Sequence, residues 1–404
     1  MRCRTGLLLG LVASVTGCLG WLSEGGGGGP RARRVDGPPE LFGLNTLFDG
    51  RPGAAEVHRL GATWVRMELV DGSGSPALDG AVQARLDGAL DDYHRANIKV
   101  LVIVDYASLG GYPGFTTCGA GAGWDGWRAR WLDRLAALAQ RERGRVDAWE
   151  VWNEPDHPVL DCNAPPSPPR YNPGMPAEVY GPLLVAAQSA LGAAGAPVVS
   201  GGSDSGHPEY LVAARAAGGS LPVDGIGVHP YYLVPDASWC PNPGAELHCE
   251  WPTIGEKIGE YANAVPGVPI WVTEFGIKTI DPHQEAEYIE AAYRAIAAQG
   301  ARVAHAFFFA YTDAMEAPFG LTDSSLQPKP EPYARFQAVT GAPQTGGGGS
   351  GGGGGMGGGG GAGSGGAGGS GGAGGNGGGG GGGSGGGGGA GGSGGGGNGG
   401  GGGG

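Results

Sequence analysis

The sequence predicts an α/β fold, a (β/α)8 TIM barrel, in a single domain that spans residues 40–344. Eight short runs of β-branched, aromatic and other apolar residues recur along this region. Segments with apolar residues at intervals of three and four separate these runs. The region has about 300 residues, a length that suits one barrel. Eight strand signals that alternate with helix signals therefore indicate a closed parallel barrel.

The predicted elements follow one another in strict alternation. Strands are expected at 41–45, 63–69, 100–105, 148–152, 197–200, 225–229, 269–273 and 303–311, and the clearest helices at 78–96, 127–143, 177–194 and 283–299. Pro176 and Pro282 lie where the first turn of a helix tolerates proline. Gly195 and Gly300 follow helices, where a left-handed cap is expected. Functional residues of such barrels gather where the strands end, because the loops there form one open face.

The first residues are typical of an export signal. Arg2 and Arg4 precede an apolar stretch, 7–15, that is too short to span a bilayer. The residues Val-Thr-Gly-Cys that end at Cys18 resemble the bacterial lipobox, in which the cysteine is lipidated and becomes the mature N-terminus. We therefore expect residues 1–17 to be a lipoprotein signal peptide and the protein to be exported to the outer membrane or cell surface. An ordinary secretory signal, which would release a secreted protein, is the alternative.

Two further segments are expected to stay outside the fold. Residues 18–39 contain five consecutive glycines and a basic cluster, a composition typical of a flexible linker. Residues 345–404 hold about half of the 92 glycines of the chain. This Gly-rich tail lacks the apolar surface needed to offset the entropy cost of ordering, so it is predicted to be disordered.

Charge and cysteine content narrow the function further. The chain has 38 acidic and 25 basic residues, a net charge of −13, which disfavours nucleic acid as a partner and fits a neutral substrate. Beyond Cys18 the mature domain keeps four cysteines, an even number, in a compartment that permits disulfides. We expect the pairs Cys118–Cys162 and Cys240–Cys249. A metal site is the alternative, but no CxxC or HxxxH spacing supports it.

Two glutamates, each at the end of a predicted strand, are the main candidates for catalysis. Glu154 lies in Trp-Asn-Glu-Pro after the fourth strand, and Glu274 lies in Thr-Glu-Phe-Gly at the seventh. A parallel barrel brings both strand ends to the same face. Cleavage of a glycosidic bond needs one carboxyl group to protonate the leaving oxygen and a second to attack or stabilise the anomeric carbon. The two glutamates are therefore interpreted as a catalytic pair.

These motifs, together with Val-His-Pro-Tyr at 228–231 after the sixth strand, resemble the retaining glycoside hydrolases of clan A, especially families 5 and 39. The resemblance covers about residues 40–340. It implies that Glu154 is the general acid/base and Glu274 the nucleophile of a double displacement, with no cofactor and no metal. It also implies that Asn153 binds the sugar 2-hydroxyl; a structural turn amide is the alternative.

The resemblance implies roles for three more residues. Arg66, at the end of the second strand, matches the arginine that pairs with the nucleophile, with a surface arginine as the alternative. Tyr231 is expected to donate a hydrogen bond to the nucleophile. His229 is expected to contact the sugar or the acid/base, although a lone histidine is more often structural.

The eighth strand departs from the clan pattern. Members of the clan usually present a tryptophan there as a platform for the sugar ring, but residues 304–313 contain none. Tyr311 or Phe309 is expected to replace it, since an aromatic face stacks on sugar C–H groups; both residues packing in the core is the alternative. Asn45, Asp105 and Asp204, after the first, third and fifth strands, are expected to bind sugar hydroxyls or to be structural. Glu68 and Glu150 are considered less suited to catalysis because neither lies in a matching motif.

Taken together, these features predict a surface-anchored, monomeric retaining glycosidase that cleaves a β-linked polysaccharide of the β-glucan, xylan or mannan type. The membrane is expected as a partner only through the lipid anchor. A catalytically inactive carbohydrate-binding lipoprotein and a transglycosylase are the alternatives. The same acid/base serves water and a sugar acceptor, so the motifs do not separate hydrolysis from transfer.

Overall fold

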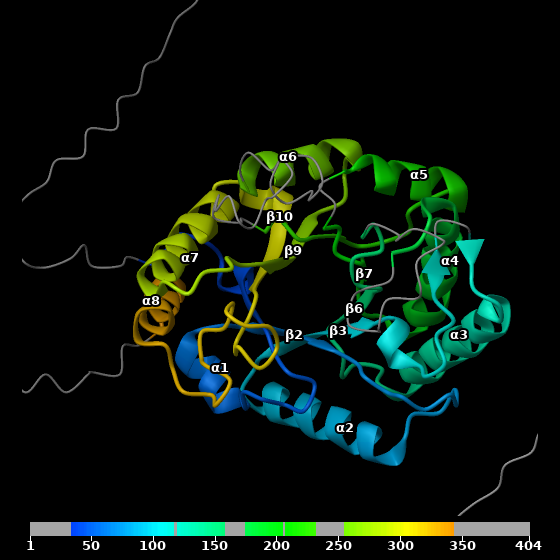
Figure 1. Cartoon of the computed structure of the whole chain (residues 1–404), viewed down its shortest axis with the longest axis horizontal. Coiled ribbons are helices and arrows are strands. Elements are labelled where there is room, and N and C mark those ends of the chain that lie inside the picture. The colour runs from blue at the N-terminus through cyan, green and yellow to red at the C-terminus, as the bar shows by residue number, and fades with distance from the viewer. Residues whose placement is uncertain (1–33, 117–118, 158–173, 205–206, 232–253, 343–404) are drawn as a thin grey trace, which may run out of the picture. The chain divides into compact units, whose positions relative to one another are not determined.

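The computed structural model describes residues 34–116, 119–157, 174–204, 207–231 and 254–342. Within them, eight parallel strands form one curved sheet and the helices are arranged in a ring around it (Figure 1). The strands are β1 (Phe42–Asn45), β2 (Trp64–Glu68), β3 (Lys99–Val104), β6 (Ala148–Val151), β7 (Val198–Ser200), β8 (Ile226–Val228), β9 (Ile270–Phe275) and β10 (Val303–Phe308). All eight predicted strands are therefore confirmed, with differences of a few residues at their ends.

The strand order makes the sheet a TIM barrel. Neighbouring strands follow the order β7-β6-β3-β2-β1-β10-β9-β8, so β1 pairs in parallel with both β2 and β10. Isolated parallel bridges, Val199 to Gly225 and Ser203 to Val228, bring β7 alongside β8. The chain thus winds once around the barrel, and every strand ends at the same face.

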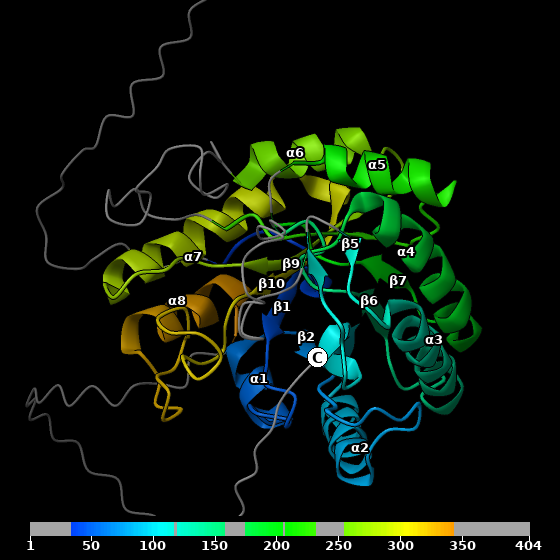
Figure 2. The same cartoon turned by 45° about the vertical axis from the view of Figure 1, so that its right-hand side comes forward.

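Eight α-helices of the described residues cover the outside of the barrel (Figure 2). They are α1 (Ala54–Leu60), α2 (Gly80–Arg95), α3 (Trp124–Arg141), α4 (Ala177–Leu191), α5 (Glu209–Gly218), α6 (Ile254–Ala264), α7 (Pro282–Ala297) and α8 (Pro330–Thr340). Local sequence explains their starts: the side chain of Asp79 accepts hydrogen bonds from the backbone at the start of α2, and Asp281 does the same before Pro282. Gly195 and Gly300 adopt the predicted positive φ, 76° and 59°.

The interior of the barrel is filled at one end by large side chains. Trp64, Trp271 and Phe307 pack inside it with Leu101, Ala148 and Val199. Gly43 makes room for this layer, because a Cβ atom there would lie 2.4 Å from the ring of Phe307. The barrel is therefore filled by side chains at this end. The space for a site lies at the other end, where the strands finish.

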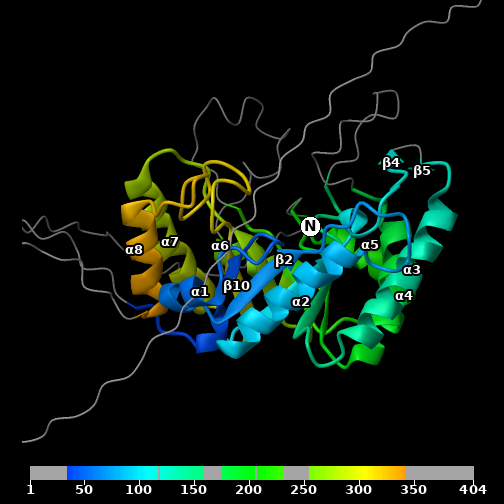
Figure 3. The same ribbon diagram turned by 90° about the horizontal axis from the view of Figure 1, so that it is seen from below.

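The loops on that face carry extra structure. The short strands β4 (Phe115–Thr116) and β5 (Gly119–Ala120) form a hairpin between β3 and α3. This hairpin and the loop that follows β10 both lie along the upper edge of the molecule in Figure 3.

The predictions about the chain ends lie mostly outside the described residues. These include the signal peptide with Cys18, most of the linker, the Gly-rich tail, and the cysteines Cys118, Cys162, Cys240 and Cys249. The packed domain begins before residue 40, because Val35 is buried and its amide donates to the carbonyl of Val339 in α8. Among the described helices, none combines the length and apolar character that a bilayer span requires.

Candidate active site

A cavity of about 700 Å³ opens where the barrel strands end. Residues that follow β1, β2, β3, β6, β8, β9 and β10 line it, and both Glu154 and Glu274 are among them. The two predicted catalytic glutamates therefore face one cavity, although 120 residues of sequence separate them.

The turn after β6 holds Glu154 in an unusual backbone conformation. Trp152 has φ 76° and Glu154 has φ 46°, both in the left-handed region that residues other than glycine rarely adopt. The indole of Trp152 is fully buried and packs edge-on against Trp127 and Trp131 of α3. Such strain persists only where the surroundings enforce it, and it recurs at functional sites. Packing of Trp152 thus presents Glu154 to the cavity.

Glu274 lies near the end of β9 and is 6% exposed. Its Oε1 accepts a hydrogen bond from Arg66 Nη1, and its Oε2 accepts one from the hydroxyl of Tyr231. Burial raises the pKa of Glu274, but the charges of His229 and Arg66 and the hydrogen bonds from Tyr231 and Arg66 lower it below its ordinary value. Glu274 is therefore held as a carboxylate.

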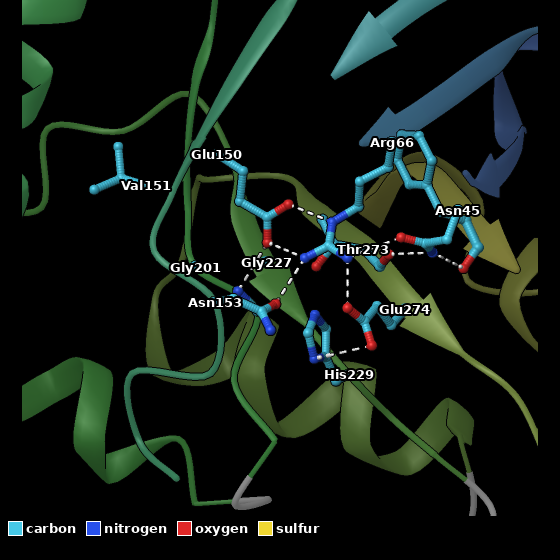
Figure 4. Close-up of polar contacts among 12 residues, drawn as sticks. Asn45, Arg66, Glu150, Val151, Asn153, Gly201, Gly227, His229, Thr273 and Glu274 are labelled. Atoms are coloured by element: carbon cyan, nitrogen blue, oxygen red, sulfur yellow. Dashed lines mark hydrogen bonds and ion pairs between the residues drawn. The ribbon is translucent and has the colours of Figure 1, made fainter. Parts of the chain in front are cut away.

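Arg66 joins several parts of the site through one buried guanidinium (Figure 4). It donates two hydrogen bonds to Glu150, at 2.6 and 3.0 Å. It also donates to Asn45 Oδ1 and to Asn153 Oδ1, each at 2.8 Å, besides Glu274. Burial lowers the pKa of Arg66, but the charges of Glu150 and Glu274 raise it above its ordinary value. The expected pairing of Arg66 with Glu274 is present.

Glu150 has a role that the sequence analysis missed. It is fully buried in β6, binds Arg66 through both carboxylate oxygens, and accepts a hydrogen bond from the amide of Gly202 at 3.0 Å. The sequence did contain an indication of this role, because Glu150 is a charged residue inside an otherwise apolar strand. Such a residue needs a buried partner of opposite charge. Glu150 anchors Arg66 and does not line the cavity.

Asn153 and Asn45 differ in whether their side-chain amides keep a hydrogen-bonding group available for a ligand. Oδ1 of Asn153 accepts from Arg66, which fixes the amide and leaves Nδ2 without a partner among the described residues, at the wall of the cavity. Asn45 instead uses both ends of its amide, because Oδ1 accepts from Arg66 and Nδ2 donates to the carbonyl of Thr273 at 3.0 Å. Asn45 therefore positions Arg66 and also lines the cavity, and its contact with a sugar stays a prediction.

His229 stands between the two glutamates. Its Nδ1 lies 3.0 Å from Glu154 Oε1 and 3.7 Å from Glu274 Oε2. Its Nε2 has no hydrogen-bond partner among the described residues, and the ring lies so close to Gly202 that a Cβ there would be 1.9 Å away. A single ring proton therefore belongs on Nδ1. Burial lowers the pKa of His229, but the charges of Glu274 and Glu154 raise it above its ordinary value.

The glutamates are close enough to act on one bond. One carboxylate oxygen from each of Glu154 and Glu274, together with a nitrogen of His229, lie within 4.8 Å of one another. A second such group joins Glu154, His157 and Asp204. Three donor atoms at such distances resemble a metal site. In the group that contains Glu274, however, Arg66 already supplies the positive charge, and a metal ion bound there would be repelled by that buried cation.

Aromatic side chains form another part of the cavity wall. Phe309 and Phe319, from the loop after β10, line the cavity and pack against Tyr231 at centroid distances of 6.0 and 5.5 Å. Phe309, one of the two candidates for the missing tryptophan, therefore lines the cavity. Tyr311 does not line the cavity: its ring is 5% exposed and belongs to the hydrophobic core. The expectation that Tyr311 binds sugar is thus corrected, because β10 ends at Phe308 and strand alternation does not extend to Tyr311.

The two acidic residues at the ends of β2 and β3, Glu68 and Asp105, differ in their access to the cavity. Asp105 is fully buried, does not line the cavity, and accepts a hydrogen bond from the amide of Ala107 at 2.7 Å. Glu68, which the sequence analysis set aside, does line the cavity. Burial raises the pKa of both carboxyl groups, and the charge of Glu68 raises the pKa of Asp105 further. Asp105 therefore fits the structural alternative, and Glu68 is the carboxyl group that faces the cavity.

Comparison with known proteins gives structural likenesses only. No family model and no curated protein matches the sequence. A family 39 glycoside hydrolase from Bacteroides cellulosilyticus WH2 is similar in structure, with a TM-score of 0.53 and 20% identity over 75% of this chain and 64% of that chain. This chain therefore spans less than two thirds of that protein.

Two further solved structures are similar to this barrel. A family 10 endo-beta-1,4-xylanase from Gloeophyllum trabeum has a TM-score of 0.52 and 16% identity, over 76% of this chain and 96% of that chain. An exo-beta-1,4-mannosidase from Opitutaceae bacterium strain TAV5 has the same TM-score and identity, over 76% of this chain and 60% of that chain. The chain thus shares the barrel fold of these glycoside hydrolases.

Proposed function

We propose that this protein is a retaining glycoside hydrolase that cleaves O-glycosidic bonds of a β-linked polysaccharide by double displacement. The observation that carries the proposal is the pair of carboxylate oxygens of Glu154 and Glu274 within 4.8 Å of each other at one cavity. Retaining enzymes hold their carboxyl groups about 5 to 5.5 Å apart, whereas inverting enzymes leave about 6.5 to 9.5 Å for a water molecule. The short separation favours the retaining mechanism.

The surroundings of the two glutamates divide the work between them. Glu274, kept ionised by Arg66 and Tyr231, attacks the anomeric carbon and forms the glycosyl-enzyme. Glu154 protonates the departing oxygen, and the same group then removes a proton from the water that releases the sugar. His229 contacts Glu154 and orients it for both steps. Nδ2 of Asn153, fixed by Arg66, donates to the sugar 2-hydroxyl beside the reacting carbon.

The lining of the cavity and the structural likenesses support this substrate class. The lining combines aromatic rings, which stack on sugar C–H groups, with amide, imidazole and carboxylate groups that bind hydroxyls. The similar xylanase and mannosidase act on β-1,4 linkages by their names, which supports a β-linked glycan here. The volume of about 700 Å³ accommodates more than one sugar unit.

The test compares the wild type with Glu274→Ala, Glu154→Ala and a control, Glu209→Gln, which changes an exposed glutamate of α5. The proteins are incubated with β-glucans, xylans and mannans, and released reducing ends and the first-formed anomer are measured. We expect retained configuration, loss of activity in both alanine variants, restoration of Glu274→Ala or Glu154→Ala by azide, and an unchanged control. An inverted product, or glycan binding without any released ends across the panel, contradicts the proposal.

A further inference from the structure

His157 forms a second histidine–carboxylate contact at the cavity, and the catalytic scheme above does not use it. Its Nδ1 lies 2.9 Å from Asp204 Oδ2 and 4.0 Å from Glu154 Oε2. The side chain of Asp204 is almost completely buried, whereas that of His157 is 33% exposed and lines the cavity. The imidazole is therefore held from behind by a buried carboxylate while one side of it remains open to a ligand.

The backbone around His157 is fixed on several sides. Its amide donates to the carbonyl of Glu154 at 3.1 Å, so the acid/base and the histidine share one turn. Gly174 packs against this turn so closely that a Cβ there would lie 1.8 Å from the carbonyl oxygen of His157. The amide of Asp204 donates to Asp156 Oδ1 at 3.0 Å, which ties the loop after β7 to the same turn. The imidazole is thus placed before any ligand arrives, which lowers the entropy cost of binding one.

The two ring nitrogens of His157 have different surroundings. Nδ1 faces the carboxylate of Asp204 and carries a proton, as a contact with a buried carboxylate requires. Nε2 has no hydrogen-bond partner among the described residues. Burial lowers the pKa of His157, but the hydrogen bond and charge of Asp204 and the charges of Glu154 and Asp156 raise it above its ordinary value. A sugar hydroxyl pairs with Nε2 in either state, because it accepts from an imidazolium and donates to a neutral ring.

The position of His157 relative to the glutamates assigns it to one side of the scissile bond. Glu154 Oε1 faces His229, which also lies near Glu274, whereas Oε2 is the oxygen near His157. His157 and Asp204 follow β6 and β7, and β8 separates these strands from β9, which carries Glu274. The anomeric carbon must lie between the glutamates, so a group beyond Glu154 meets the leaving group.

We propose that His157, held by Asp204, binds a hydroxyl of the sugar unit on the leaving-group side of the scissile bond. This inference rests on the proposed function and adds to it a preference for a saccharide over other leaving groups. His157 is then a specificity-determining residue, because an aryl leaving group offers no hydroxyl at the corresponding place.

The experiment measures kcat/KM for two substrates with the same glycone: an oligosaccharide, whose leaving group is a sugar, and the 4-nitrophenyl glycoside. Wild type, His157→Ala and His157→Gln are compared, with thermal unfolding as a measure of folding. His157→Ala should lower kcat/KM for the oligosaccharide by about 10-fold or more, the size expected for one hydrogen bond, and change the aryl glycoside by less than about 2-fold. His157→Gln, whose amide reaches close to the place of Nε2, should restore part of the loss.

The outcomes separate this inference from the proposed function. If the wild type hydrolyses both substrates and the two variants lose activity equally on both, or on neither, His157 does not bind the leaving sugar. If the wild type hydrolyses no substrate of the panel, the proposed function fails and the inference fails with it. A selective loss on the oligosaccharide, with partial rescue by glutamine and an unchanged melting temperature, supports the assignment.

Discussion

Replacing Arg66 with methionine tests whether one buried cation organises this site. The guanidinium is 2% exposed and binds two buried carboxylates, Glu150 through both oxygens and Glu274 through one. Methionine fills similar space but leaves both carboxylates without their cation. Removing one partner of a buried ion pair costs about 3–5 kcal/mol, because the remaining charge is neither solvated nor paired. We therefore expect Arg66→Met to lower the free energy of unfolding by about 3–5 kcal/mol at pH 7.

The pH dependence of this loss gives a sharper check. The pKa of Glu274 is lowered in the folded protein, so its contribution to stability is present above the unfolded value of about 4.3 and is lost as pH falls through the folded pKa. Without Arg66, the pKa of Glu274 rises, and protonation relieves the unpaired charge at low pH. The difference between wild type and Arg66→Met should therefore be largest near pH 7 and shrink below about pH 4.

Urea unfolding at pH 7 and at about pH 3 measures both effects. Arg95→Met is the matched control, because Arg95 is exposed and forms a surface ion pair with Asp92 of the same helix. The double variant Arg66→Met, Glu150→Gln should recover part of the loss, since glutamine removes one uncompensated charge. A destabilisation below about 1 kcal/mol at pH 7, or an equal loss at both pH values, refutes the reasoning.

Four further predictions concern the site and the chain ends. Tyr231→Phe removes a hydrogen bond that lowers the pKa of Glu274, so the acidic limb of the kcat/KM profile should move to higher pH and kcat should fall by about 10-fold; an unmoved limb contradicts this. Asn153→Ala should lower kcat/KM by about 100-fold on a normal substrate and much less on a 2-deoxy glycoside, measured side by side. Mass spectrometry of exported protein should find Cys18 as a lipidated N-terminus, and an unmodified Cys18 rejects the anchor. Thiol titration before reduction should find no reactive thiol in the mature domain, whereas four reactive thiols exclude the expected pairs of Cys118, Cys162, Cys240 and Cys249.

Local sequence signals were sufficient for the fold and for the placement of Glu154 and Glu274 at one cavity. Strand and helix periodicity depends on neighbouring residues only, so all eight strands were predicted with small errors at their ends. The face that bears Glu154 and Glu274 follows from the parallel barrel itself, because every strand must end there. The pairing of Arg66 and Tyr231 with Glu274 was expected from the motifs around them and is present.

The errors arose where a role depends on which side chain meets which partner in space. Tyr311 and Phe309 are both aromatic and two residues apart, so strand alternation would point them the same way. The strand ends at Phe308, this alternation does not extend to them, and of the two only Phe309 lines the cavity. Asn45 has the right chemistry for a sugar ligand, but Arg66 and the backbone of Thr273 already occupy its amide. Composition and spacing do not reveal such competition between partners.

The amino-acid sequence by itself determined the barrel and the face on which Glu154 and Glu274 lie, because these depend on periodicity and on motifs that are contiguous in the chain. Only the tertiary structure decided that Glu150 anchors Arg66 and that Asp204 holds His157 beside Glu154. These contacts join residues that are 84 and 47 positions apart. They form because a charge is buried only where the fold supplies a group that pairs with it. Which group lies close enough depends on how distant strands and loops pack together.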